Sequence, residues 1–174
     1  MSFSSLSFLF YFLPASLLLY YLFSFSITFK NIILLICSLA FYAFGEPKNI
    51  GILILSILVN YGFGLLIGYT KNSKGRKIFF LTLSIIFNLA LLFVFKYLSS
   101  AVQTVNYFMT SPIDVGQFTF ALPIGISFFT FQAISYGIDV YRGSVGVQKN
   151  LLNFALYLSF FPKLTQGPIT KYTD

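Results

Sequence analysis

The chain alternates between long apolar runs and short polar breaks. Residues 49–70 form the clearest run, because a helix needs roughly twenty residues to cross about 30 Å of hydrocarbon. The pattern predicts an all-α fold, a polytopic transmembrane helix bundle in which residues 1–174 form a single membrane domain. The approximate spans are residues 8–29, 31–45, 49–70, 78–97 and 119–139, with a partial span at residues 150–162.

Two later runs are less regular than the others. Residues 118–138 carry Pro123, Gly125 and several polar side chains, which favours a broken or cavity-lining helix. Residues 151–161 are too few to cross the bilayer before Pro162. The sequence therefore predicts a broken or re-entrant element near the C-terminus.

Basic residues lie at the ends of the apolar runs and indicate the topology. Lys71, Lys74, Arg76 and Lys77 gather in one predicted loop, and the excess of Lys and Arg in cytoplasmic loops assigns it to the cytoplasm. The amino terminus is then extracytoplasmic, and the chain is a multi-pass protein of the cytoplasmic membrane. A nucleic-acid partner is not expected despite the net charge of +7, because the cations do not follow one polar face.

Composition narrows the chemistry further. The chain is 57% hydrophobic and 9% charged, with a mean hydropathy of +0.86, which excludes an ordinary soluble domain. It has no histidine and one cysteine, Cys37, so His-based catalysis, a metal site and an internal disulfide are not expected. The lipid bilayer is the first predicted partner.

Several motifs resemble one known family. LPIGISFFTFQAISYGIDVYRG at residues 122–143 and SFFPKLTQGPI at residues 159–169 follow FYAFGEPK at residues 41–48, ILVNYGFGLLIG at residues 57–68 and FKY at residues 95–97. Their order resembles that in the bacterial membrane-bound O-acyltransferases. The matching branch contains the alginate O-acetylation membrane protein, the peptidoglycan O-acetyltransferase and the teichoic-acid D-alanyl transfer protein.

This resemblance implies a many-helix body around a funnel in the bacterial inner membrane. It implies transfer of acetyl, or another acyl group, to hydroxyls of an extracytoplasmic polysaccharide such as alginate or peptidoglycan. The implied acyl donor is acetyl-CoA or an acyl-carrier thioester, with no cofactor bound. An extracytoplasmic acyltransferase partner is a further possibility that the resemblance raises.

The family's expected catalytic residue is a histidine, which the resemblance places beyond Asp174. Residues 1–174 are therefore expected to be the amino-terminal part of such an enzyme, an incomplete bundle that is inactive alone. Two alternatives stay open. One is a non-catalytic membrane scaffold or permease subunit, and the other is an inactive truncated product.

Asn60, Gly64 and Gly68 share one face of a predicted helix. Small residues four apart allow close helix approach, so this face is predicted to pack against another helix. A pore or substrate path is the alternative.

Three polar residues of the motif at 122–143 are candidates for the funnel. Gln132 is predicted to form an interhelical hydrogen bond near mid-span. Asp139 and Arg142, three residues apart at a helix end, are predicted to form a local ion pair. The alternative is that this pair shapes the mouth through which the acyl donor approaches.

The second motif supplies the preferred candidate for the funnel wall. Its irregular, polar backbone must line protein or water if it lies at membrane depth, and either Lys163 or backbone N–H groups are expected near the acyl carbonyl. The alternative is a purely structural turn. The candidate residues are Pro162, Lys163, Gln166, Gly167 and Pro168.

Overall fold

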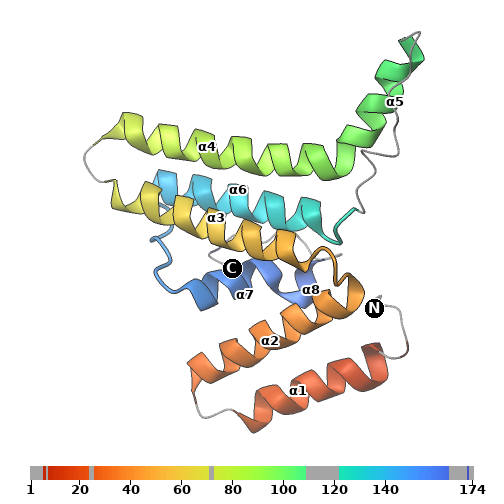
Figure 1. Ribbon diagram of the computed structural model, residues 1–174. Coiled ribbons are helices and arrows are strands. Elements are labelled where there is room, and N and C mark those ends of the chain that lie inside the picture. The colour runs from red at the N-terminus through yellow and green to blue at the C-terminus, as the bar shows by residue number, and fades with distance from the viewer. Residues whose placement is uncertain are drawn as a thin grey trace.

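The computed structural model describes residues 6, 8–23, 26–70, 73–108, 122–164 and 172, and these residues form helices and connecting turns without any strand (Figure 1). The elements are η1 (Phe8–Phe12), α1 (Leu13–Leu22), α2 (Ile27–Gly45), α3 (Ile50–Tyr69), α4 (Lys74–Leu92), η2 (Phe93–Tyr97), α5 (Leu98–Phe108), α6 (Ile126–Arg142), α7 (Leu151–Ser159) and α8 (Phe161–Leu164). The elements η1 and η2 are single π-helical turns.

Three helical stretches are long and apolar enough to cross a membrane. They are Ile27–Gly45, Ile50–Tyr69 and Lys74–Tyr107, and the last combines α4, η2 and α5. Large apolar side chains remain exposed along them, as expected for surfaces in contact with lipid. The predicted all-α membrane bundle is confirmed.

The boundary between the first two predicted spans, 8–29 and 31–45, was placed too late in the sequence. The structure ends α1 at Leu22 and begins α2 at Ile27. The Ser26 hydroxyl accepts a hydrogen bond from the backbone N–H two residues later (3.3 Å), which caps the new helix. The start of α2 is therefore set by a local side-chain cap, before the first cation.

The predicted span 78–97 also starts too late. The Ser73 hydroxyl accepts a hydrogen bond from the Arg76 N–H (3.4 Å), so α4 begins at Lys74 and includes three cations that the sequence analysis assigned to a loop. These cations lie on the first turns of a helix, which fixes their spacing.

Irregular backbone does occur within the predicted range 118–138, at its described residues before Ile126, whereas α6 itself is continuous. Gly125 adopts a left-handed conformation (φ 73°) just before the helix. A break does occur near the C-terminus, where Phe160 separates α7 from α8. Pro162 lies in the first turn of α8, where its missing N–H leaves no helical hydrogen bond unmade.

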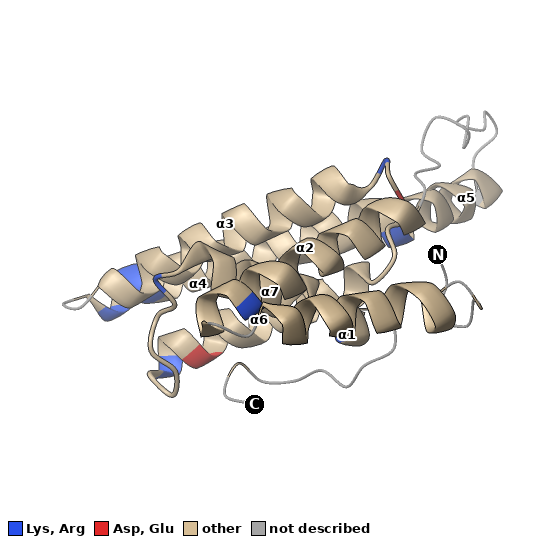
Figure 2. Cartoon of the chain, turned by 90° about the horizontal axis from the view of Figure 1, so that it is seen from below, with Lys and Arg blue, Asp and Glu red and all other residues tan. Residues whose placement is uncertain are grey.

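The helices form two connected groups. Helices α3, α4 and α6 pack together, while α2 packs against α7 and carries α1 on its other side (Figure 1). Tyr136 of α6 and Phe154 of α7 meet at a ring-centroid distance of 4.9 Å, which joins the groups through one aromatic core. Most charged residues lie at the two ends of the long helices (Figure 2).

Candidate functional site

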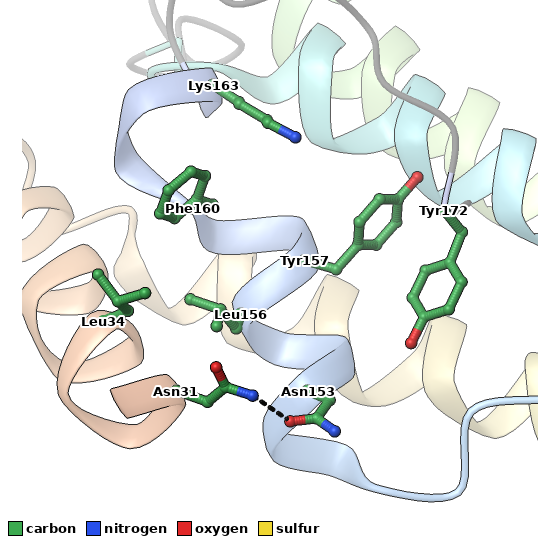
Figure 3. A pocket seen from close by; sticks show the side chains of 8 residues that line it. All are labelled: Asn31, Leu34, Asn153, Leu156, Tyr157, Phe160, Lys163 and Tyr172. Carbon is green, nitrogen blue, oxygen red and sulfur yellow. Dashed lines mark hydrogen bonds between the residues drawn. The ribbon is translucent and has the colours of Figure 1, made fainter. Parts of the chain in front are cut away.

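A hollow of about 480 Å³ opens between α2 and the α7–α8 segment (Figure 3). We call it the α2/α7 pocket. Its walls combine amides, phenol hydroxyls and one ammonium group with aliphatic and aromatic surface. The lining residues are Asn31, Leu34, Asn153, Leu156, Tyr157, Phe160, Lys163 and Tyr172.

An asparagine pair forms one edge of the pocket. The Asn31 side-chain N–H of α2 donates a hydrogen bond to the Asn153 side-chain oxygen of α7 (3.1 Å), as Figure 3 shows. Both residues are half-buried, and among the described residues the amide oxygen of Asn31 and the amide nitrogen of Asn153 have no other hydrogen-bond partner. This edge therefore offers both an acceptor and a donor.

Two tyrosines form another wall. Their rings meet edge to face at a centroid distance of 4.9 Å. The Tyr157 hydroxyl donates a hydrogen bond to the Gln132 backbone carbonyl of α6 (3.4 Å), and the Tyr172 hydroxyl is hydrogen-bonded to the Gln148 side chain. These bonds fix the directions of both phenols at the pocket wall.

Lys163 brings a positive charge to the pocket. Its Nζ atom lies 5.9 Å from the centroid of the Phe160 ring, and Figure 3 shows the side chain directed into the space between α8 and Tyr157. The described lining residues include neither a carboxylate nor an imidazole. Their ammonium, amide and hydroxyl groups suit the pocket to holding a carbonyl or an anionic group.

The α8 segment separates this pocket from a second, apolar hollow of about 300 Å³. Pro162 lines the second hollow together with α1 residues, while Leu34 and Phe160 line both. A Cβ atom on Gly125 would overlap the Leu164 carbonyl, so the start of α6 lies directly against α8. The predicted wall segment thus lies between two hollows as far as Leu164. Gln166, Gly167 and Pro168 lie outside the described residues.

Two predictions for the motif at 122–143 are wrong in the described part of the chain. Gln132 is buried, but its side-chain amide makes no interhelical hydrogen bond to a described residue, and only its backbone carbonyl accepts one, from Tyr157 of α7. Asp139 and Arg142 form no ion pair. The Ser144 hydroxyl contacts the backbone carbonyl and Oδ1 of Asp139 (3.0 and 3.5 Å), because the chain turns back over the helix end at Gly143.

The face of α3 with Asn60, Gly64 and Gly68 lies against other parts of the chain. A Cβ atom on Gly64 would lie 2.6 Å from Cε1 of Tyr136, and one on Gly68 would lie 2.6 Å from the Val147 Cβ atom. Asn60 is hydrogen-bonded to Asn88 of α4. In the described part of the chain this face is occupied by helix packing, as predicted from its small residues.

Sequence reasoning missed the role of Glu46. Its Oε2 atom accepts hydrogen bonds from the Asn49 side chain (2.7 Å) and from the Ile124 backbone N–H (3.0 Å). The carboxylate therefore ties the turn between α2 and α3 to the segment before α6. The sequence offered one signal for such a role. Acidic residues are rare in this chain, which has only four of them.

The pocket residues belong to a sequence with close bacterial relatives. The chain is 40% identical over 177 residues to the probable alginate O-acetylase AlgI of Azotobacter vinelandii, and 39% identical over 177 residues to the protein of the same name from Pseudomonas aeruginosa. Both matches cover 100% of this chain. The chain is homologous to the amino-terminal third of these O-acetylases.

A peptidoglycan O-acetyltransferase of Helicobacter pylori is 30% identical over 194 residues, covering 96% of the chain. The chain spans 34 to 36% of the length of these three relatives. No protein-family model and no solved structure matches the chain. The resemblance to the bacterial membrane O-acyltransferases is confirmed, and the residues of the α2/α7 pocket lie within the homologous region.

Proposed function

We propose that this chain forms the amino-terminal helical part of a membrane-bound acetyltransferase that esterifies hydroxyls of an extracytoplasmic polysaccharide. The observation that carries the proposal is the 40% identity, over the whole chain, to a probable alginate O-acetylase. An alginate-like polymer is the favoured acceptor, and the more distant relative makes peptidoglycan the second.

The proposed reaction moves an acyl group from a thioester, either acetyl-CoA or an acyl-carrier protein, to a hydroxyl oxygen. The bond from the acyl carbon to sulfur breaks, a bond to oxygen forms, and the hydroxyl proton passes through a base to the departing thiolate. The chain has no histidine, so the family's expected base is not among residues 1–174. The acceptor is reached either directly or through an extracytoplasmic partner protein.

The α2/α7 pocket is the proposed contribution of this chain to the funnel. An acyl carbonyl gains negative charge when it is attacked, and a fixed cation or hydroxyl near it lowers the barrier. Lys163 provides such a cation above the apolar surface of Leu34 and Leu156, which suits a short acyl chain. In this proposal Lys163 stabilises the developing oxyanion.

The proposed location is the bacterial inner membrane, with the amino terminus outside the cytoplasm. Lys30 near the start of α2, the cations at the start of α4 and Arg142 at the end of α6 lie toward one end of the bundle. The turn between α2 and α3, which carries Glu46 and Lys48, lies at the other end (Figure 1). Basic residues concentrate on the cytoplasmic side of membrane proteins, which supports this orientation.

The first test removes the gene for this chain from its host and measures ester-linked acetate released by mild alkali from envelope polysaccharides. We expect the acetate of one polymer to fall and to return when the gene is restored. Unchanged acetate on every polymer, with the polymers still made, would reject the proposed function.

A second test addresses the pocket in the natural full-length protein. Lys163→Met is expected to lower the rate of acetyl transfer by roughly 10²-fold, the effect of losing one oxyanion-stabilising group. Lys48→Met, in an exposed turn, is the matched control and is expected to keep the rate. If Lys163→Met retains the full rate, the role of the pocket is wrong even where the gene deletion supports the activity.

A further inference from the structure

A separate hollow of about 380 Å³ lies between the start of α4 and the end of α6. It is lined by Lys74, Lys77, Tyr141 and Arg142, so two helices bring three cations and one phenol to the same surface. It shares no lining residue with the α2/α7 pocket. Tyr141 also packs against the hydrophobic core, but the proposed acyl transfer uses none of these side chains.

These cations have no anionic partner within the described part of the chain. Asp139 precedes Arg142 by one helical turn, but its Oδ1 atom accepts from the Ser144 hydroxyl and its Oδ2 atom has no hydrogen-bond partner among the described residues. Three positive charges around one hollow repel each other and create a positive potential there. The arrangement is favourable when an anion occupies the hollow.

Packing below the hollow fixes the distance between its two walls. Leu81 of α4 lies in van der Waals range of the position that a Cβ atom on Gly137 of α6 would occupy (3.6 Å). Lys74 and Lys77 are three residues apart, so the helix holds both on one side of α4. The hollow is therefore held by two packed helices.

We propose that this hollow binds the phosphate group of an anionic phospholipid. Basic pockets between membrane helices on the cytoplasmic side bind such headgroups, and tyrosine side chains favour the membrane interface. Ile78, one turn beyond Lys74, leaves 44% of its surface exposed, so apolar surface for an acyl chain begins beside the cations. A soluble phosphate has the same headgroup chemistry but would not use that apolar surface.

The proposal is independent of acyl transfer and is tested by lipid binding. Native mass spectrometry of the natural full-length protein in detergent measures its affinity for phosphatidylglycerol and for phosphatidylcholine with the same acyl chains. We expect tighter binding of phosphatidylglycerol. The triple substitution Lys74→Gln, Lys77→Gln and Arg142→Gln should weaken phosphatidylglycerol binding by at least about tenfold.

The matched control is Lys30→Gln with Lys149→Gln, which removes cations that do not line the hollow. It should change the affinity less than about twofold, in line with weak effects of distant screened charges. Equal affinity of the triple variant and the unchanged protein would overturn the proposal, and so would equal binding of the two lipids. If the triple variant does not fold, Arg142→Gln alone is used, because Arg142 is exposed, and unchanged affinity there also overturns the proposal.

Competition with inorganic phosphate distinguishes the two sources of the anion. If excess phosphate leaves phosphatidylglycerol bound, the site is specific for the lipid. Displacement of the lipid by phosphate, lost in the triple variant, would keep the phosphate site but assign it to a soluble ligand, which overturns the lipid assignment.

Discussion

A pair of asparagines joins α3 to α4, and another pair joins α2 to α7. The two pairs differ in the number of hydrogen bonds between them and in their exposure to solvent. Asn60 and Asn88 exchange two hydrogen bonds (3.2 and 2.6 Å) and are 2% and 0% exposed. Asn31 and Asn153 share one bond (3.1 Å) and remain half-buried at the edge of a pocket. The closed pair serves packing, while the open pair leaves polar atoms available to a ligand.

The helices around the two asparagine pairs differ in the same way, since one group is tightly packed and the other contains hollows. Ser84 donates a further hydrogen bond to Asn60 (3.3 Å), and Gly64 brings α3 against Tyr136 of α6. Two hollows lie beside α2, one of them lined mainly by apolar residues of α1 and α8. Substitutions in the α3–α4–α6 group should therefore change stability most, and substitutions in the α2–α7–α8 group should affect function more than stability.

The largest expected effect is that of Gly64→Ala. The new Cβ atom would lie 2.6 Å from Tyr136, whose hydroxyl is held by the Gln148 N–H (2.9 Å), so the ring cannot withdraw freely. Overpacking of this kind costs about 2–3 kcal/mol. Thermal unfolding in detergent measures the loss. Gly62→Ala is the control on the same helix, because nothing lies within 4 Å of its Cβ position. Equal melting temperatures of the two variants would contradict the close approach.

Asn88→Ala should cost about 1–2 kcal/mol, because both buried hydrogen bonds between the two amides are lost and Asn60 keeps only Ser56 and Ser84 as described partners. The same unfolding measurement applies. Replacing both residues by Ala should cost less than the sum of the two single changes, since each single change already removes both Asn60–Asn88 hydrogen bonds. Additive effects would show that the pair is not coupled.

Glu46→Gln should destabilise the protein by about 1 kcal/mol, because the charge-assisted bonds to Asn49 and to the Ile124 N–H become neutral ones. Hydrogen exchange of the Ile124 amide would show faster opening of the segment before α6. Lys48→Gln, in the same turn but exposed, is the control and should leave that exchange unchanged.

Asn31→Ala should have the smallest effect on stability, below about 0.5 kcal/mol, because Asn153 is half-buried and water can replace its partner. The rate of acetyl transfer by the full-length protein is measured in parallel. Expressed as a free energy, its decrease is expected to exceed the loss of unfolding free energy. A loss of stability as large as that of Asn88→Ala would remove the distinction between the open and closed pairs.

The sequence predicted the helices well where the signal was local. The run at 49–70 matches α3 within one residue at each end, because a long apolar stretch has no other stable form in lipid. The errors at the starts of α2 and α4 came from counting cations and overlooking Ser26 and Ser73, whose hydroxyls cap the helices. Those signals were present in the sequence.

Side-chain contacts between helices that are distant in sequence could not be predicted from local patterns. The ion pair expected for Asp139 and Arg142 followed from helical spacing, but the turn at Gly143 places Ser144 on the carboxylate instead. The contact between Glu46 and Ile124 joins residues that are 78 positions apart. The α2/α7 pocket likewise needs Asn31 and Lys163 on one surface, and no local pattern links them.

The sequence by itself determined the membrane environment, the helical class and the resemblance to the bacterial O-acetylases, because hydropathy and ordered motifs are properties of contiguous residues. Only the tertiary structure decided which polar groups meet, which asparagine pair closes, and where the cations of α4 and α6 surround a hollow. The physical reason is that helix crossings are set by side-chain packing between distant segments, so a small change in register exchanges every partner along an interface.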